Sequence, residues 1–232
     1  MRLSALVILT ALLASCSIGE SLAFKSTSKI LVRAQPSLQM ESDYELARAA
    51  IPGALKTVEG FWVAGPPDDA AERLVRILTE GYCQYGTGFV EDDWEVATFA
   101  KDLPAIAYHN ARASNIFTRC LNFSLKLLGK RWQKEIFGTP EQVAKLVADT
   151  GKGHRFELMF AGAALGGLVN HNLSRIEMIS YLDTVKAIVN RVIEIDTKSG
   201  PPKNKAHAAL PYLALGQNVQ FVLDDTLYEI YE

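Results

Sequence analysis

The chain has 232 residues, of which 49% are hydrophobic and 22% are charged, and its formal net charge is −2 at pH 7. The part after residue 40 is long enough for one domain with a hydrophobic core. Its mildly acidic balance argues against general nucleic-acid binding.

The first forty residues have the composition of a targeting leader. Residues 3–14 form an almost unbroken apolar run, which has the length of a signal-peptide core and is too short to span a bilayer. Residues 24–40 carry three basic residues and four Ser/Thr residues but no acid, a pattern typical of a transit peptide. We therefore expect a signal peptide over residues 1–23 and a transit peptide over residues 24–40.

This two-part leader resembles the presequence that directs proteins into the complex plastids of algae such as diatoms. In that presequence the transit peptide typically begins with an aromatic residue, and Phe24 follows Ala23 in this chain. The resemblance covers residues 1–40. It implies a protein of the plastid stroma whose mature N-terminus lies near Met40.

Two other interpretations of the leader stay open. Leu13-Ala14-Ser15-Cys16 resembles a bacterial lipoprotein box, in which Cys16 would be lipidated and become the first residue. Plain secretion is the second alternative. The acid-free stretch 24–40 favours the plastid interpretation, because a lipoprotein tether has no reason to avoid Asp and Glu there.

Beyond the leader, the pattern predicts an all-α fold, most simply a single-domain helical bundle over residues 41–232. Capping boxes predict helix starts at Ser42 and Ser174, and Pro52 is expected to interrupt the first helix. An apolar stripe at helical spacing predicts one continuous core-facing helix over 174–196. The other helices are expected at about 68–85, 91–102, 104–129 (or to 137), 139–149, 154–169 and, after a polar linker at 197–205, 206–232, the last with a break near Pro211. The apolar helix at 154–169 is too short to cross a bilayer, so no transmembrane segment is expected in the mature chain.

One predicted helix carries a patterned surface. Five basic residues between 103 and 134, a stretch without an acid, fall on one face at 100° per residue: Arg112, Arg119, Lys126, Lys130 and Lys134. We call this set the basic stripe. It is either an ordinary solvated face or a docking face for an anionic protein or lipid surface. Acidic residues at 91–95 or at the C-terminus could also lie against it within the molecule.

Two smaller features surround the apolar helix at 154–169. Three cations at its N-terminus form a candidate anion site, with a plain turn as the alternative: Lys152, His154 and Arg155. Three glycines within it would allow close approach of another helix or of a flat pigment: Gly162, Gly166 and Gly167. His109 and His171 are each able to ligate a tetrapyrrole metal, although a lone helical histidine is more often structural.

No catalytic or metal-ligand motif is readable, so the pattern favours binding over catalysis. We interpret the chain as a non-catalytic plastid accessory or assembly protein, associated with the photosynthetic apparatus through the basic stripe and without a cofactor. The alternatives are a helical protein that binds a tetrapyrrole or carotenoid, and an enzyme without a recognisable motif. Cys83 and Cys120 are expected to be small buried hydrophobic residues, with a redox pair as the alternative.

Overall fold

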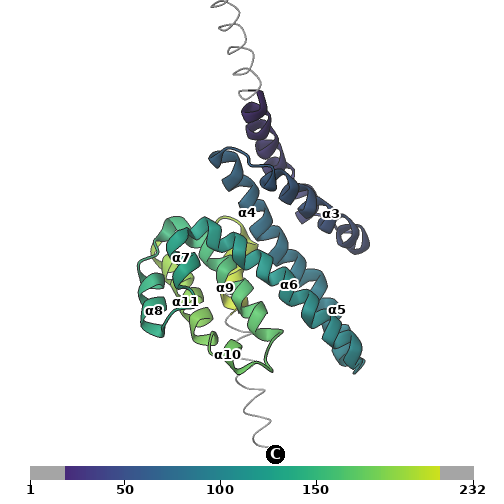
Figure 1. Ribbon diagram of the computed structural model, residues 1–232, viewed down its shortest axis with the longest axis vertical. Coiled ribbons are helices and arrows are strands. Elements are labelled where there is room, and N and C mark those ends of the chain that lie inside the picture. Colours follow the sequence, from purple (N-terminus) through teal and green to yellow (C-terminus); the bar gives the residue numbers. More distant parts are fainter. Residues whose placement is uncertain (1–18, 215–232) are drawn as a thin grey trace, which may run out of the picture. The chain divides into compact units, whose positions relative to one another are not determined.

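The computed structural model describes residues 19–214, and every regular element in that range is helical (Figure 1). The all-α prediction is confirmed. The described residues form two compact units, one ending at Leu78 and the other beginning at Thr79. Cys16, most of the expected signal peptide and the acidic C-terminal tail at 215–232 lie outside the described residues.

The first unit joins part of the predicted leader to the following helices. Its elements are the helical residues 19–34, α2 (Pro36–Gln39), α3 (Tyr44–Val63) and the first part of α4 (Asp68–Tyr85). Arg73 of α4 donates a hydrogen bond of 3.0 Å to the hydroxyl of Ser28, which is fully buried. Lys25 lies 3.7 Å from Asp69. Residues of the expected transit peptide therefore pack against α4.

The first long helix differs from its prediction at two points. Asp43, rather than Ser42, is the N-cap, and its carboxylate accepts the backbone N–H of Leu46 at 3.0 Å. The predicted interruption at Pro52 was wrong, because α3 continues through it. A proline removes one backbone hydrogen bond, but packing of an apolar face supplies most of a helix's stability in a protein. Buried residues on both sides of Pro52 supply that packing here: Ala47, Leu55 and Val58.

The second unit is organised around α9 (Arg155–Asn170). This helix packs against α6 (Leu103–Leu128) and α11 (Leu182–Ser199), while α5 (Glu91–Phe99) lies against α6 and α8 (Pro140–Ala148) lies against α11 (Figure 1). Shorter elements complete the unit: a π-helical turn at Gly86–Val90, α7 (Lys130–Glu135), a 3-10 turn at Lys152–His154, α10 (Ile176–Ile179) and the helical residues 205–214. The core therefore centres on the apolar helix that the sequence predicted to be buried.

The helix predicted over 174–196 is divided in two. Ser174 caps nothing; Arg175 precedes the short α10 and makes no side-chain capping bond. Ile176 is 83% exposed, so no apolar contact holds the first turn in line with α11. The prediction of one continuous helix was therefore wrong, and the core-facing stripe begins only at Val185.

The C-terminal part of the described chain also shifts relative to its prediction. The polar linker expected from Thr197 begins later, because α11 runs to Ser199 and ends at Gly200, whose φ is 82°. Pro211 was expected to break the last helix, yet it is buried within the helical residues 205–214.

Cys83 of α4 and Cys120 of α6 form a disulfide, with their Cα atoms 5.3 Å apart. The expectation of two separate buried thiols was wrong, because nothing in the spacing of two cysteines shows that their helices meet. Disulfides persist mainly in oxidising compartments and are rare in the cytosol. The bond therefore bears on where the protein resides.

We predict that replacing both cysteines by alanine lowers the free energy of unfolding by about 2–4 kcal/mol, because the bond restricts the unfolded chain. Urea unfolding of the wild type with and without a reductant measures the effect. The Cys83→Ala/Cys120→Ala variant is the control, since reductant should leave its midpoint unchanged. A wild-type midpoint that does not fall on reduction would contradict the prediction.

Candidate functional site

A cavity of about 680 Å³ lies in the second unit, walled by α5, α9 and the helical residues 205–214. Small-molecule sites typically have volumes in this range. Its larger apolar side chains come from several helices: Trp94, Phe99, Phe117, Met159, Val185, Leu210 and Leu213. Its charged lining consists of two carboxylates, Glu91 and Glu95, and no described Lys, Arg or His lines it. The cavity is thus mainly apolar, with acidic groups on one side.

The acidic side of the cavity is one face of α5. Glu91, Trp94, Glu95 and Thr98 all line it, at the i, i+3, i+4, i+7 spacing of a single helical face. That spacing was readable in the sequence. Such a face is usually recognised by apolar residues, whereas this one mixes acids with a tryptophan, so the spacing alone did not predict a cavity wall.

The three glycines predicted on α9 line the cavity and also serve close packing. A Cβ atom on Gly167 would come within 2.7 Å of the Phe117 ring, and one on Gly162 within 3.0 Å of Ile188. At Gly166 the nearest atom would be 3.6 Å away, on Val185, which is an ordinary contact. Because Gly162 and Gly167 have no side chains, α11 and α6 approach α9 closely, and no side chain of the three glycines fills the cavity.

We predict that Gly167→Ala lowers the free energy of unfolding by about 1–3 kcal/mol, because the added methyl group collides with a buried ring. Gly166→Ala is the matched control on the same helix. It should be neutral or should stabilise by up to about 1 kcal/mol through better helix propensity. Chemical denaturation of the two variants tests this contrast, and equal stability of both would refute it.

His171 contacts Glu91, on the acidic side of the cavity, and holds its carboxylate in place. Its Nδ1 lies 2.9 Å from Asn110 Oδ1, and its Nε2 lies 3.2 Å from Glu91 Oε1. The ring stacks on Phe117 with centroids 6.0 Å apart and meets Trp94 edge-on at 5.1 Å. Both ring nitrogens are engaged and the residue is buried, so the structure gives His171 a positioning role rather than that of a metal ligand.

The structure divides the basic stripe. Arg112 is half-buried and donates to Asp93 at 2.9 Å and to the Tyr85 hydroxyl at 2.6 Å. An acid from 91–95 thus lies against this end of the stripe, which was one of the outcomes open in the sequence. Phe123, which the helix angle also places on this face, is buried and stacks on Tyr82.

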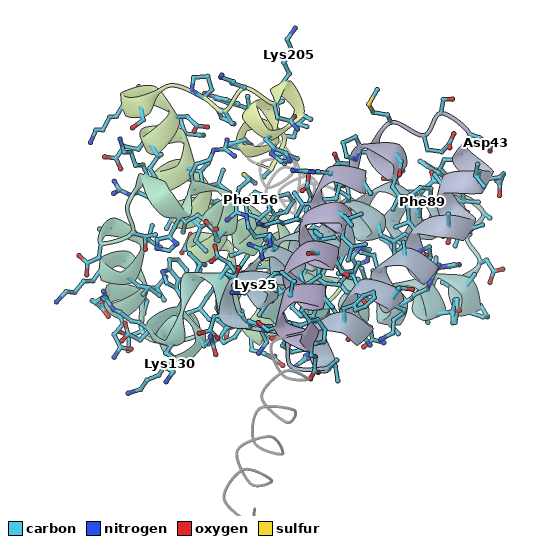
Figure 2. All side chains as sticks on the ribbon, turned by 90° about the horizontal axis from the view of Figure 1, so that it is seen from above. Lys25, Asp43, Phe89, Lys130, Phe156 and Lys205 are labelled. Atoms are coloured by element: carbon cyan, nitrogen blue, oxygen red, sulfur yellow. A yellow bond between two sulfur atoms is a disulfide. The ribbon has the colours of Figure 1, made fainter. Side chains whose placement is uncertain are left out.

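The remaining members of the stripe lie at the surface on two different helices. Arg119 lies 5.6 Å from the centre of the Tyr82 ring, in cation–π geometry. Gly129, with a φ of 95°, ends α6, so Lys130 and Lys134 belong to α7 and their angles cannot be extrapolated from α6. Lys126, Lys130 and Lys134 are exposed, and Lys130 extends away from the ribbon (Figure 2).

The three cations of the predicted anion site do not converge. Arg155 makes a two-pronged ion pair with Asp196, at 2.9 and 2.6 Å, and donates to the His207 carbonyl at 2.8 Å. His154 lies 3.9 Å from Glu157, and Lys152 is exposed. Arg155 therefore joins α9 to α11 and to the C-terminal helical residues instead of facing an anion.

Comparison with known proteins gives one match. The model of a family described as TAtT, TRAP transporter T-component, matches residues 40–201. No curated protein and no solved structure matches the chain. Between residues 19 and 214, no helix combines the length and the apolar character that crossing a membrane requires.

The family match contradicts the functional interpretation drawn from the sequence. A transporter component is a different class of protein from a plastid accessory protein of the photosynthetic apparatus, and nothing supports the tetrapyrrole or carotenoid alternative. The error arose because compartment and function were both inferred from the leader. The resemblance of the leader itself stays a prediction, since residues 1–18 lie outside the described part.

Proposed function

The chain belongs to the TRAP transporter T-component family, and we propose that it acts as an accessory component of such a transporter, binding a partner component and a small molecule. The observation that carries this proposal is the family match over residues 40–201, which includes the whole of α9. The cavity supports the binding of a small molecule, because its volume and apolar lining suit one.

Exposed apolar side chains on two consecutive helices support the binding of a partner. Four of them lie on α5 and the first turns of α6, and we call this set the apolar surface: Val96, Phe99, Leu103 and Tyr108. Phe99 is 85% exposed and also lines the cavity, so this surface reaches the cavity wall. Clustered exposed apolar residues mark interaction sites on soluble domains. We propose that the partner component docks on this apolar surface.

We predict that Phe99→Ser with Leu103→Ser reduces retention of the transporter's other components about tenfold or more, because buried apolar anchors carry most of the energy of an interface. Affinity purification of the full chain from cells that contain the transporter, with mass-spectrometric identification of those components, measures retention. Ile176→Ser is the matched control, since Ile176 is equally exposed on α10.

A second pair of variants separates apolar docking from electrostatic docking. Arg119→Glu with Lys126→Glu reverses two exposed charges of the basic stripe and should leave retention unchanged if the apolar surface carries the contact. Retention lost in the charge-reversal variant but kept in the Phe99/Leu103 variant would transfer the docking role to the basic stripe. Retention unaffected by either pair would refute docking at both surfaces.

We also propose that the protein is held outside the cytosol by a lipid on Cys16, which lies outside the described residues. The disulfide between Cys83 and Cys120 supports an oxidising compartment. Processing at Cys16 would keep the helical residues 19–34, whose Ser28 and Lys25 contact α4. Processing near Met40 would remove them and leave Arg73 without its buried partner.

We predict that the native protein begins at a lipid-modified Cys16 and that Cys16→Ser releases it from the membrane fraction, because the acyl chains on this cysteine would supply the membrane affinity. Intact-mass measurement and membrane fractionation test this. An unmodified N-terminus near Met40 would overturn the anchoring proposal. A wild-type protein that carries no lipid and is found outside the membrane fraction would indicate plain secretion.

A further inference from the structure

We propose that the helical residues 205–214, which we call the gate, open and close the cavity of the second unit, and that the contacts of His207 keep the gate closed. The gate opens about the linker at 200–204 and lets a small molecule enter and leave. This inference rests on the proposed function in one respect, because it takes the cavity as the site of the small molecule. Its basis is the unequal attachment of the three walls of the cavity.

Two of these walls are held by the core of the unit. α9 has nine buried residues and packs against both α6 and α11. α5 is held at its first turn, where Glu91 contacts His171 at 3.2 Å. In the same turn Asp93 accepts a hydrogen bond of 2.9 Å from Arg112 of α6. Movement of either helix breaks contacts inside the unit, so neither wall is suited to open.

The third wall, the gate, has few buried side chains. Among its residues only Pro211 is buried, while Tyr212 and Leu213 are 59% and 62% exposed. The linker at 200–204, which joins the gate to α11, has no buried residue. Lids over binding sites come from such parts of a protein, because local opening requires little free energy where few apolar side chains are buried. The gate is therefore the wall that is able to open.

The gate is able to move as one body because it carries its own helix cap. The side-chain oxygen of Asn204 accepts the backbone N–H groups of Ala206 at 2.9 Å and of His207 at 3.2 Å. This cap satisfies the first N–H groups of the helix from the adjoining linker, so opening does not require their loss. The change in chain direction falls on the linker, since a few residues at the end of an element are enough to form a hinge.

The contacts that keep the gate closed converge on His207. Its Nε2 lies 2.8 Å from Oε1 of Glu80, a residue of α4 that is only 7% exposed. Its backbone carbonyl accepts a hydrogen bond of 2.8 Å from Arg155 of α9. Its ring meets the Phe160 ring edge-on, with centroids 5.8 Å apart. Opening separates a buried carboxylate from its hydrogen-bond partner, and such bonds are stronger than those between neutral groups. Loss of the His207 side chain should therefore favour the open gate.

Hydrogen exchange of the full chain, read by mass spectrometry, tests whether the gate opens locally. We expect its amides to exchange at least about tenfold faster than those of α9. Their rate should not change in dilute urea, because local opening exposes little surface. His207→Ala should raise the exchange rate of the gate about tenfold further. Lys205→Ala is the matched control, because Lys205 is exposed on the same segment and extends away from the ribbon (Figure 2).

A second measurement connects the gate to the cavity. Ala163→Cys places a thiol in the cavity lining, and its reaction with N-phenylmaleimide, located by peptide mass spectrometry, measures access to the cavity. Cys83 and Cys120 are joined to each other and do not compete. Adding His207→Ala should raise the labelling rate of the introduced thiol about tenfold, as it raises the opening of the gate. Adding Lys205→Ala should leave the labelling rate unchanged.

Two results would each overturn the inference. One is exchange of the gate and of α9 at the same rate and with the same dependence on urea. The other is a labelling rate of the introduced thiol that His207→Ala does not change. If the His207→Ala variant does not fold, Glu80→Gln weakens the same contact with little change of shape and should act in the same direction.

Failure of the gate is distinguishable from failure of the proposed function. Neither measurement uses the other transporter components, so their retention by the wild type is an independent result. Retention without local opening would overturn the gate alone, whereas local opening without retention would count against the proposed function alone.

Discussion

Burial of α9 between α6 and α11 is the constraint on which the second unit depends. Nine of its residues are buried, and the contact with α6 is close because Gly167 offers no Cβ atom to the Phe117 ring. Two further interactions link helices of the second unit. The disulfide joins α4 to α6, and the ion pair between Arg155 and Asp196 joins the first turn of α9 to α11. An ion pair this buried is costly to break, because removing one partner leaves the other charge without compensation.

The cavity wall is a consequence of that packing. Phe117 lies against Gly167 on one side and stacks on His171 on another, and His171 in turn contacts Glu91. The position of the Glu91 carboxylate is therefore linked through two rings to a glycine at the helix contact. A side chain at Gly167 would move Phe117, and the acidic wall would lose its support. The geometry of the cavity wall therefore depends on the packing of the core.

The sequence predicted what local patterns determine. Thr139 caps α8 through a capping box, and the bounds of α4 and the burial of α9 follow from their residues alone. What the sequence missed depends on contacts between distant residues. The disulfide needs α4 and α6 side by side, and Pro52 is tolerated because flanking residues are buried.

The prediction that the five residues of the basic stripe share one helix face was wrong for a related reason. The helix angle that aligned Arg112 with Lys134 assumes an unbroken helix, but α6 ends at Gly129. In addition, Arg112 pairs with Asp93, which belongs to another helix. Local periodicity describes one helix at a time, whereas a surface depends on where helices stop and on which neighbours they meet. The acidic face of α5 shows the reverse case, because its spacing was present in the sequence and only the neighbouring helices make it a cavity wall.

The segment that completes the cavity lies beyond the family match. That match ends at residue 201, while Leu210 and Leu213 belong to the helical residues 205–214. His207 holds this segment on the unit: its Nε2 lies 2.8 Å from Glu80 Oε1, its carbonyl accepts from Arg155, and its ring contacts Phe160. The same Arg155 that joins α9 to α11 thus fixes the far wall of the cavity. The matched residues 40–201 include the glycines and the acids of the cavity wall, whereas Leu210 and Leu213 close the cavity from a segment that the family match does not cover.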